Sequence, residues 1–121
     1  MRTAILTAML TAALAAPAMG ASYPVSGKWG QSASSKKGAI ECHGRRVMSF
    51  NGDQRTDSGG SVHAFQNRSI TADGPSQYRI VDVFTTGQIS DGHTSYTLRQ
   101  VDADHIVVQS PQGTVKLQRC K

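Results

Sequence analysis

The chain has 121 residues, a net charge of +5 and 17% charged residues. This length fits one ordinary domain and leaves no room for a second. The basic residues are dispersed apart from Lys36-Lys37 and Arg45-Arg46, and no aromatic residue is interleaved with them as a stacking platform for bases. We therefore expect no nucleic-acid partner, and we interpret the positive charge as a solvated face that aids solubility.

Residues 1–20 are predicted to be a signal peptide. Arg2 supplies a positive start, residues 4–16 form an apolar run, and Pro17 ends any helix. Small residues allow cleavage before Ala21, with cleavage after Ala18 as the alternative. The run is shorter than the roughly 20 residues that cross a bilayer, so we expect no transmembrane anchor. A bacterial periplasmic or secreted protein is the resulting prediction.

The two cysteines, Cys42 and Cys120, are predicted to form one disulfide. An oxidising compartment allows them to pair, and an even count leaves no spare thiol. In the chain-entropy model such a long closed loop contributes roughly 4 to 5 kcal/mol of stability. The rival interpretation, two free or metal-binding thiols, lacks the close C-x-x-C spacing of zinc and redox sites. We expect no metal and no cofactor.

The first half of the exported part predicts several short strands. In chain order they cover residues 27–32, 39–42, 46–50, 61–65 and 69–72, and Met48 and Phe50 share one face of the third. Residues 32–38 are small and polar, and we interpret them as a mobile loop. The segment before Ser26 is predicted to be flexible.

Alternation with period two is clearer in the second half. Residues 78–85 place Tyr78, Ile80 and Phe84 on one face, which predicts a central strand. Tyr96 and Leu98 predict the next strand. Two further strands are centred on residues 106–108 and 115–117.

Glycine-containing turns separate these runs, which favours hairpin connections. They lie at residues 51–52, 73–75, 91–92 and 111–113. About eight short strands joined in this way predict a single all-β domain over residues 21–121. We expect a small antiparallel up-and-down β-barrel, because closure removes exposed strand edges, with a β-sandwich as the alternative.

The start of the first strand, Ser26-Gly27-Lys28-Trp29, carries a resemblance. It is similar to the Gly-x-Trp opening of lipocalins and of the small bacterial metalloprotease inhibitors that share a related eight-stranded barrel. The resemblance implies that Trp29 closes the floor of a barrel. It also implies that Cys42 and Cys120 tie the C-terminus to the barrel wall.

No catalytic signature is present in the sequence. The chemistry-bearing residues are four histidines, His43, His63, His93 and His105, and the cluster of residues 102–105, Asp-Ala-Asp-His. A carboxylate beside a histidine can bind a metal or move a proton, but aspartate between two strands is favoured because it caps turn amides. We therefore predict a protein that is not an enzyme.

Two functions remain open from the sequence. The first is a monomeric barrel that binds an unknown small molecule, with interior or ligand-facing residues Trp29, Met48, Phe50, Tyr78, Phe84, Tyr96 and Leu98. The alternative is an inhibitor or interaction partner of an envelope or secreted hydrolase, which would act through loops or the N-terminal segment.

Overall fold

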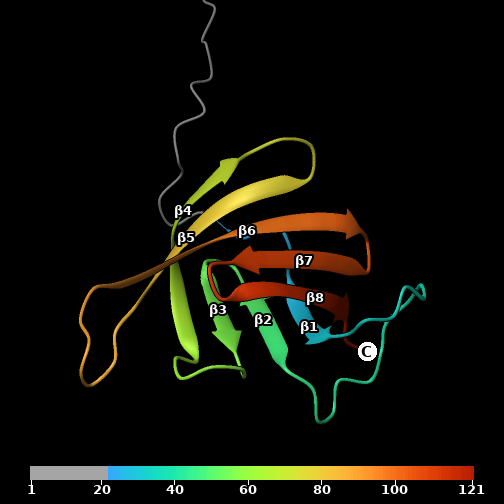
Figure 1. The fold of residues 1–121 in the computed structure, drawn as a ribbon, viewed down its shortest axis with the longest axis horizontal. Coiled ribbons are helices and arrows are strands. Elements are labelled where there is room, and N and C mark those ends of the chain that lie inside the picture. Colours follow the sequence, from blue (N-terminus) through green and yellow to red (C-terminus); the bar gives the residue numbers. More distant parts are fainter. Residues whose placement is uncertain (1–21) are drawn as a thin grey trace, which may run out of the picture.

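The computed structural model describes residues 22–121, so the predicted signal peptide lies outside the described residues (Figure 1). Eight strands make up the fold: β1 (Gly27–Gln31), β2 (Val47–Asn51), β3 (Gln54–Asp57), β4 (Ala64–Ala72), β5 (Gln77–Phe84), β6 (Gly92–Asp102), β7 (His105–Ser110) and β8 (Gly113–Arg119). The described part contains no helix, and therefore none that is long and apolar enough to cross a membrane.

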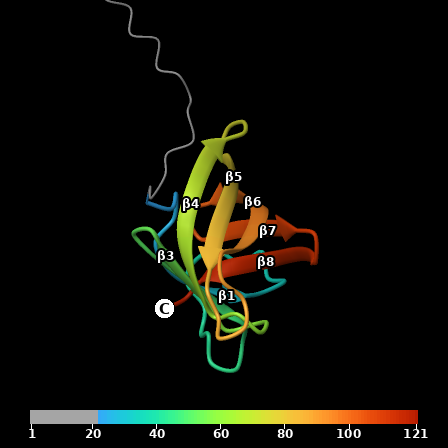
Figure 2. The same cartoon turned by 90° about the vertical axis from the view of Figure 1, so that its left-hand side faces the viewer.

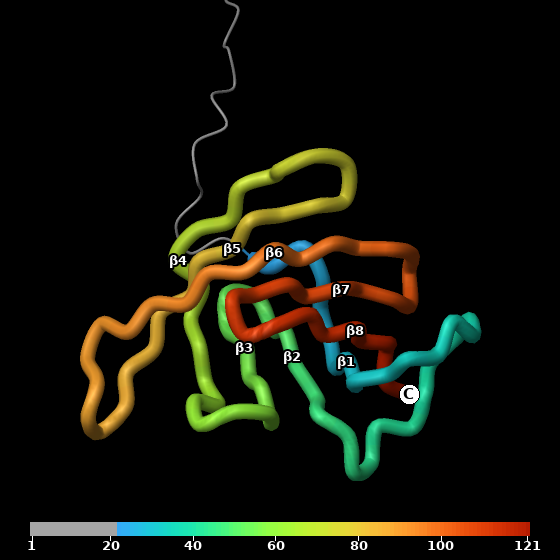
Figure 3. Tube along the Cα trace, viewed as in Figure 1, coloured from blue at the N-terminus to red at the C-terminus, as the bar shows by residue number. Residues whose placement is uncertain are grey.

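The strands form one closed antiparallel barrel. Each strand pairs with the next along the chain, and β8 pairs with β1 to complete the circle. Figure 3 shows the chain running up and down in this order, and β4 and β5 project beyond the other strands in two views (Figures 1 and 2). The up-and-down barrel is confirmed, and the β-sandwich alternative is wrong.

Three strand assignments in the first half differ from the sequence prediction. Residues 39–42 form no strand, and only an isolated bridge joins Ile40 to Cys120. Of the predicted runs 61–65 and 69–72, residues 64–65 and 69–72 belong to one strand, β4, which has a bulge between Asn67 and Ser69, and residues 61–63 precede it. Strand β3 was missed, because its inward residues are charged and give no apolar alternation.

The turn at residues 51–52 explains why β3 follows β2 so closely. Gly52 has φ of 63°, a left-handed conformation that glycine adopts without steric cost. The chain therefore reverses after Asn51 and pairs Gln54 with it directly. The turns predicted at residues 73–75 and 111–113 likewise join β4 to β5 and β7 to β8.

An apolar core fills the end of the barrel where the N-terminal segment enters, which we call the closed end. Trp29 is fully buried there, and its indole Nε1 donates a hydrogen bond to the Ser26 carbonyl at 3.0 Å. The ring of Tyr23 packs edge-on against Phe50, with ring centroids 5.1 Å apart. The backbone of Tyr23 also donates to the Gly52 carbonyl at 2.9 Å, which places the segment beside the β2–β3 turn.

The segment before Ser26, which is predicted to be flexible, packs against the barrel in the residues that the structure describes. Tyr23 and Val25 are each only 7% exposed and belong to the core cluster. The physical reason is that the barrel end needs an apolar cover, and these two side chains supply it. The segment is therefore part of the fold.

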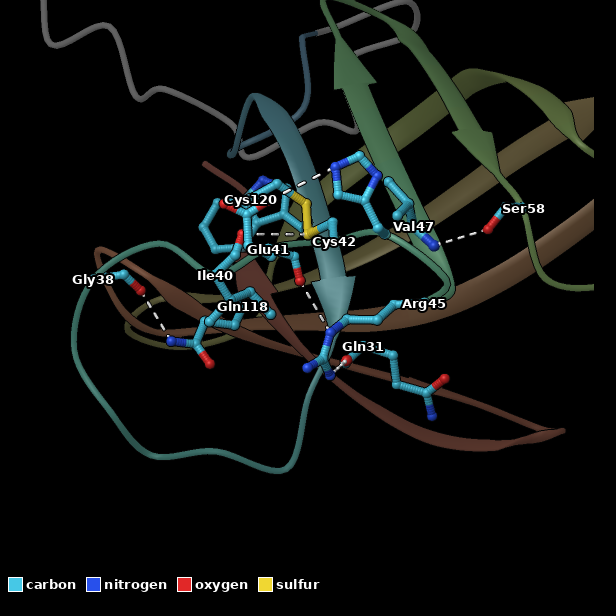
Figure 4. Close-up of a disulfide and its surroundings, with 12 residues drawn as sticks. Gln31, Gly38, Ile40, Glu41, Cys42, Arg45, Val47, Ser58, Gln118 and Cys120 are labelled. Carbon is cyan, nitrogen blue, oxygen red and sulfur yellow. Dashed lines mark hydrogen bonds and ion pairs between the residues drawn. A yellow bond between two sulfur atoms is a disulfide. The ribbon is translucent and has the colours of Figure 1, made fainter.

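The predicted disulfide is confirmed. Cys42 and Cys120 are bonded across a sequence separation of 78 residues (Figure 4). The bond lies against the backbone of Gly30 in β1, and a Cβ atom at this position would collide with the sulfur of Cys42. A glycine beside Trp29 thus makes room for the bond.

The long β1–β2 connection, residues 32–46, is fastened to the barrel at several points. The buried side chain of Gln118 donates from Nε2 to the Lys36 carbonyl at 2.8 Å and to the Gly38 carbonyl at 2.9 Å, and Figure 4 shows the bond to Gly38. The backbone of Ile40 donates to the Arg119 carbonyl at 2.9 Å. The backbone of Ser32 donates to the Lys116 carbonyl at 2.9 Å, and the disulfide at Cys42 holds the second half of the connection.

Candidate functional site

A cavity of about 560 Å³ opens at the barrel end opposite the closed end. In an up-and-down barrel the connections alternate between the two ends, so the β1–β2, β3–β4, β5–β6 and β7–β8 connections share this end, which we call the mouth. The apolar part of the cavity wall consists of Met48, Val62, Phe65, Phe84, Tyr96, Val108 and Val115. Three charged residues join them: Arg46, Arg55 and Asp57.

Below the cavity, a buried carboxylate organises the barrel interior. Asp82 on β5 is fully buried, and its Oδ2 accepts from Arg55 Nε at 2.7 Å and from the Tyr96 hydroxyl at 2.8 Å. Its Oδ1 accepts from the Tyr23 hydroxyl at 2.8 Å and from Asn67 Nδ2 at 3.3 Å. Four donors on four segments therefore satisfy one charge that would be costly to bury alone.

Burial fixes the protonation states in this cluster. It raises the pKa of the Tyr23 and Tyr96 hydroxyls well above the usual range of tyrosine, and the charge of Asp82 adds to the rise. Burial by itself would lower the pKa of Arg55, but attraction from Tyr96 and Asp82 holds that pKa above its ordinary value. Both tyrosines thus remain hydrogen-bond donors, and Arg55 remains a cation.

A second ion pair lies at the rim of the cavity. Arg46 donates from Nε and Nη2 to the two carboxylate oxygens of Asp57, at 3.0 and 2.7 Å. The backbone N–H of Gly59 also donates to Asp57, at 2.9 Å, and Arg55 Nη1 lies 3.7 Å from it. The hydrogen bonds that Arg46 donates to Asp57 raise the pKa of Arg46. The carboxylate of Asp57 is therefore well supplied with donors.

Aromatic rings enclose the Arg55 guanidinium. Its central carbon lies 3.9 Å from the ring centroid of Phe65 and 4.9 Å from that of Tyr96. Phe65 in turn packs edge-on against Phe84, with centroids 5.6 Å apart. Such cation–π contacts stabilise a partly desolvated arginine and hold its plane in one orientation. The wall of the cavity is consequently built before any ligand arrives.

The residues predicted to face the interior separate into two groups. Met48, Phe84 and Tyr96 line the cavity. Trp29, Phe50 and Leu98 are buried in the core and do not line it, while Tyr78 is partly buried against the core.

The sequence analysis missed the charged members of the site, Arg46, Arg55, Asp57 and Asp82. One signal was available for Asp82, because it alternates with Ile80 and Phe84 and must share their inward face. Arg55 and Asp57 lie on the short strand β3, and Arg46 directly precedes β2. Because these residues are charged, they give no apolar alternation from which their inward position could be predicted.

Of the four histidines, His93 is one of the residues that line the cavity. His43 is almost fully exposed, and no group of three or more potential metal ligands occurs in this part of the chain. His105 Nδ1 lies 2.7 Å from Asp102 Oδ1, which also accepts from the backbone N–H of Asp104 at 2.8 Å. The hydrogen bond with His105 lowers the pKa of Asp102. The cluster thus caps the β6–β7 turn.

Comparisons of the chain with protein-family models, with curated proteins and with solved structures give no match. The class of protein is therefore defined by the fold and the cavity alone. It is a small, closed, eight-stranded antiparallel barrel, pinned by one disulfide, with an aromatic and charged cavity at one end.

Proposed function

We propose that this protein is an exported, monomeric and non-catalytic module that binds a small organic molecule in the cavity at the mouth. The observation that carries the proposal is the cavity itself, about 560 Å³, whose walls combine aromatic and aliphatic side chains with polar and charged ones. Small-molecule sites typically measure 300 to 1,000 Å³ and combine apolar walls with a few fixed polar groups. The proposed ligand is therefore of the size of a drug-like or signalling molecule.

Rigid support for the walls is the second argument. Arg55 is held by Asp82 and by two aromatic rings, and Asp57 is held by Arg46 and Gly59. A site whose side chains are already fixed loses little conformational entropy when a ligand binds. The disulfide is compatible with a periplasmic or extracellular location, which supports the proposed export.

Filling the cavity with a side chain tests this function. Val115 lines the cavity, and Val107 on the neighbouring strand β7 lies between two buried residues and is our matched outward position. The probe is 1-anilinonaphthalene-8-sulfonate, whose fluorescence rises in apolar sites. We expect Val115→Trp to weaken probe binding at least tenfold and Val107→Trp to leave it within about twofold. A size difference of one methylene group in an apolar pocket already changes binding about tenfold, and an indole ring fills far more space.

Equal probe binding by the wild type and Val115→Trp would contradict the proposal. That result would favour the alternative function, an inhibitor or interaction partner of an envelope or secreted hydrolase. The fastened loop of residues 32–46, which projects from the barrel (Figure 1), is the surface that this alternative would use.

A further inference from the structure

Among the charged side chains of the cavity wall, the arginines keep unused hydrogen-bond donors, whereas the carboxylate is already well supplied. Asp57 already accepts three hydrogen bonds, two from Arg46 and one from Gly59. In contrast, Nη1 of Arg46 and Nη2 of Arg55 donate no hydrogen bond to any side chain or backbone group of residues 22–121. A ligand that enters here meets unused guanidinium N–H groups rather than an unused carboxylate.

Positive charge also predominates among the charged residues that line the cavity. Two arginines and one aspartate line the cavity, whereas Asp82 lies behind Arg55, is fully buried and is not part of the wall. The balance of these lining charges is therefore positive. The whole chain has a net charge of +5, to which the predicted signal peptide contributes only Arg2, and this positive charge attracts anions from solution.

The apolar part of the wall fixes where the rest of the ligand lies. Phe65 and Phe84 form one side of the cavity through their edge-on contact, and Val108 and Val115 also belong to its lining. Arg55 lies directly against Phe65, so the donor groups and the aromatic surface are adjacent. A molecule with one charged end and one ring or chain fits this arrangement.

We propose that the ligand is an amphipathic organic carboxylate. Its carboxylate accepts hydrogen bonds from Arg46 and Arg55, and its ring or chain lies against Phe65 and Phe84. Guanidinium groups suit this role because their planar donors match carboxylate oxygens and keep their charge at any physiological pH. This inference rests on the proposed binding function and adds to it the chemical class of the ligand.

Three probes that share one ring test the charge preference on the wild-type protein. They are naphthalene-2-carboxylate, 2-naphthalenemethanol and 2-naphthylmethylamine, which are anionic, neutral and cationic at pH 7. Isothermal titration calorimetry is expected to give at least tenfold tighter binding of the carboxylate than of the alcohol, with the amine weakest. This comparison needs no mutant and therefore does not depend on whether a variant folds.

Two adjacent arginines supply the matched variants. Arg46→Gln removes the rim guanidinium and is expected to weaken carboxylate binding about tenfold while leaving alcohol binding within about twofold. Arg45→Gln is the control, because Arg45 donates to the carbonyls of Glu41 and Gln31 and lies outside the cavity. The thermal midpoint of each variant shows whether it is folded.

The outcomes separate this inference from the function on which it rests. If all three probes bind equally and Val115→Trp abolishes binding, the binding function stands and the carboxylate preference is overturned. The preference is also overturned if Arg45→Gln and Arg46→Gln cause the same loss. If no probe binds, both proposals are overturned.

Discussion

The two ends of the barrel differ in how their interior is filled. At the closed end, Trp29, Tyr23 and Val25 fill the interior, and the indole N–H of Trp29 is paired with a nearby carbonyl. At the mouth the interior is hollow, and the guanidinium groups of Arg46 and Arg55 keep donors that no described residue uses. Apolar side chains therefore stabilise the closed end, whereas the mouth keeps hydrogen-bond donors for a ligand.

Asp82 connects the two ends. It accepts a hydrogen bond from Tyr23 of the closed end and forms the ion pair that fixes Arg55 at the mouth. Removal of the Asp82 carboxylate should therefore affect the closed end and the mouth together.

The largest expected effect is that of Asp82→Ala. It leaves Arg55 as a buried cation without its partner and two tyrosine hydroxyls without an acceptor. Removing one partner of a buried pair costs about 3 to 5 kcal/mol, which is most of the stability of a small domain. Urea denaturation followed by circular dichroism is the measurement.

The matched control for this variant is Asp73→Ala. Asp73 forms an exposed ion pair with Arg79, at 3.8 Å, and such pairs contribute at most about 1 kcal/mol. If Asp82→Ala costs no more than Asp73→Ala, the carboxylate does not connect the two ends.

Tyr23→Phe removes only the hydrogen bond by which the closed end contacts Asp82. The variant keeps the ring against Phe50 and removes the hydroxyl that donates to Asp82. Hydrogen bonds to charged groups contribute about 1.5 to 3 kcal/mol, so we expect a loss of about 2 kcal/mol at pH 7. Probe binding at the mouth should change little, because Arg55 still pairs with Asp82.

The pH dependence sharpens this prediction. The pKa of Tyr23 and Tyr96 is raised in the folded state above the ordinary value of 10.0, so their protonated forms favour folding. The resulting stabilisation is fully present below pH 10 and is lost as the pH rises further, because the unfolded chain then releases protons that the folded chain retains. Above pH 10 each tyrosine should lower the free energy of unfolding by about 1.4 kcal/mol per pH unit.

Urea titrations between pH 9 and 11.5 measure this slope. Tyr23→Phe, which keeps only one of the two Asp82-bound tyrosines, should show a clearly shallower decline than the wild type. Tyr78→Phe is the control, because Tyr78 forms no hydrogen bond with Asp82 and its loss leaves both bound tyrosines in place. Identical slopes for all three proteins would contradict the assignment.

The two ends also differ in how well the sequence predicts them. The closed end obeys simple rules, since Trp29, Phe50 and Leu98 are large and apolar and lie where period-two alternation puts them. The disulfide was predicted from a count of two cysteines in a chain that we expect to be exported. Apolar alternation and turn residues were together sufficient for the strand number and the closed barrel.

The mouth could not be predicted in this way, because its inward residues are charged. Arg55 and Asp57 alternate correctly on β3, but a pattern search for apolar residues passes over them. Their burial depends on partners that are distant in sequence, such as Asp82 for Arg55. Such pairings become visible only when the strands are placed side by side.

The smallest expected effect concerns the outer cover of the closed end. The Arg119 guanidinium lies over the indole ring of Trp29, 4.4 Å from its centroid, and donates from Nη2 to the Ala103 carbonyl at 3.0 Å. Cation–π contacts at exposed sites contribute about 0.5 to 1 kcal/mol, so Arg119→Met should cost about 1 kcal/mol in urea denaturation. Arg99→Met, at an exposed position without such a contact, should cost less than about 0.5 kcal/mol.

Trp29 reports this change directly, because it is the only tryptophan in the chain. Loss of the Arg119 cover should let water reach the indole and shift its emission to longer wavelength, while probe affinity at the mouth stays the same. A variant that changed both signals together would show that the two ends are coupled through more than Asp82. If the emission of Trp29 changes and the probe affinity does not, the closed end can be altered without disturbing the cavity. The core between the two ends would then transmit little of a small local change.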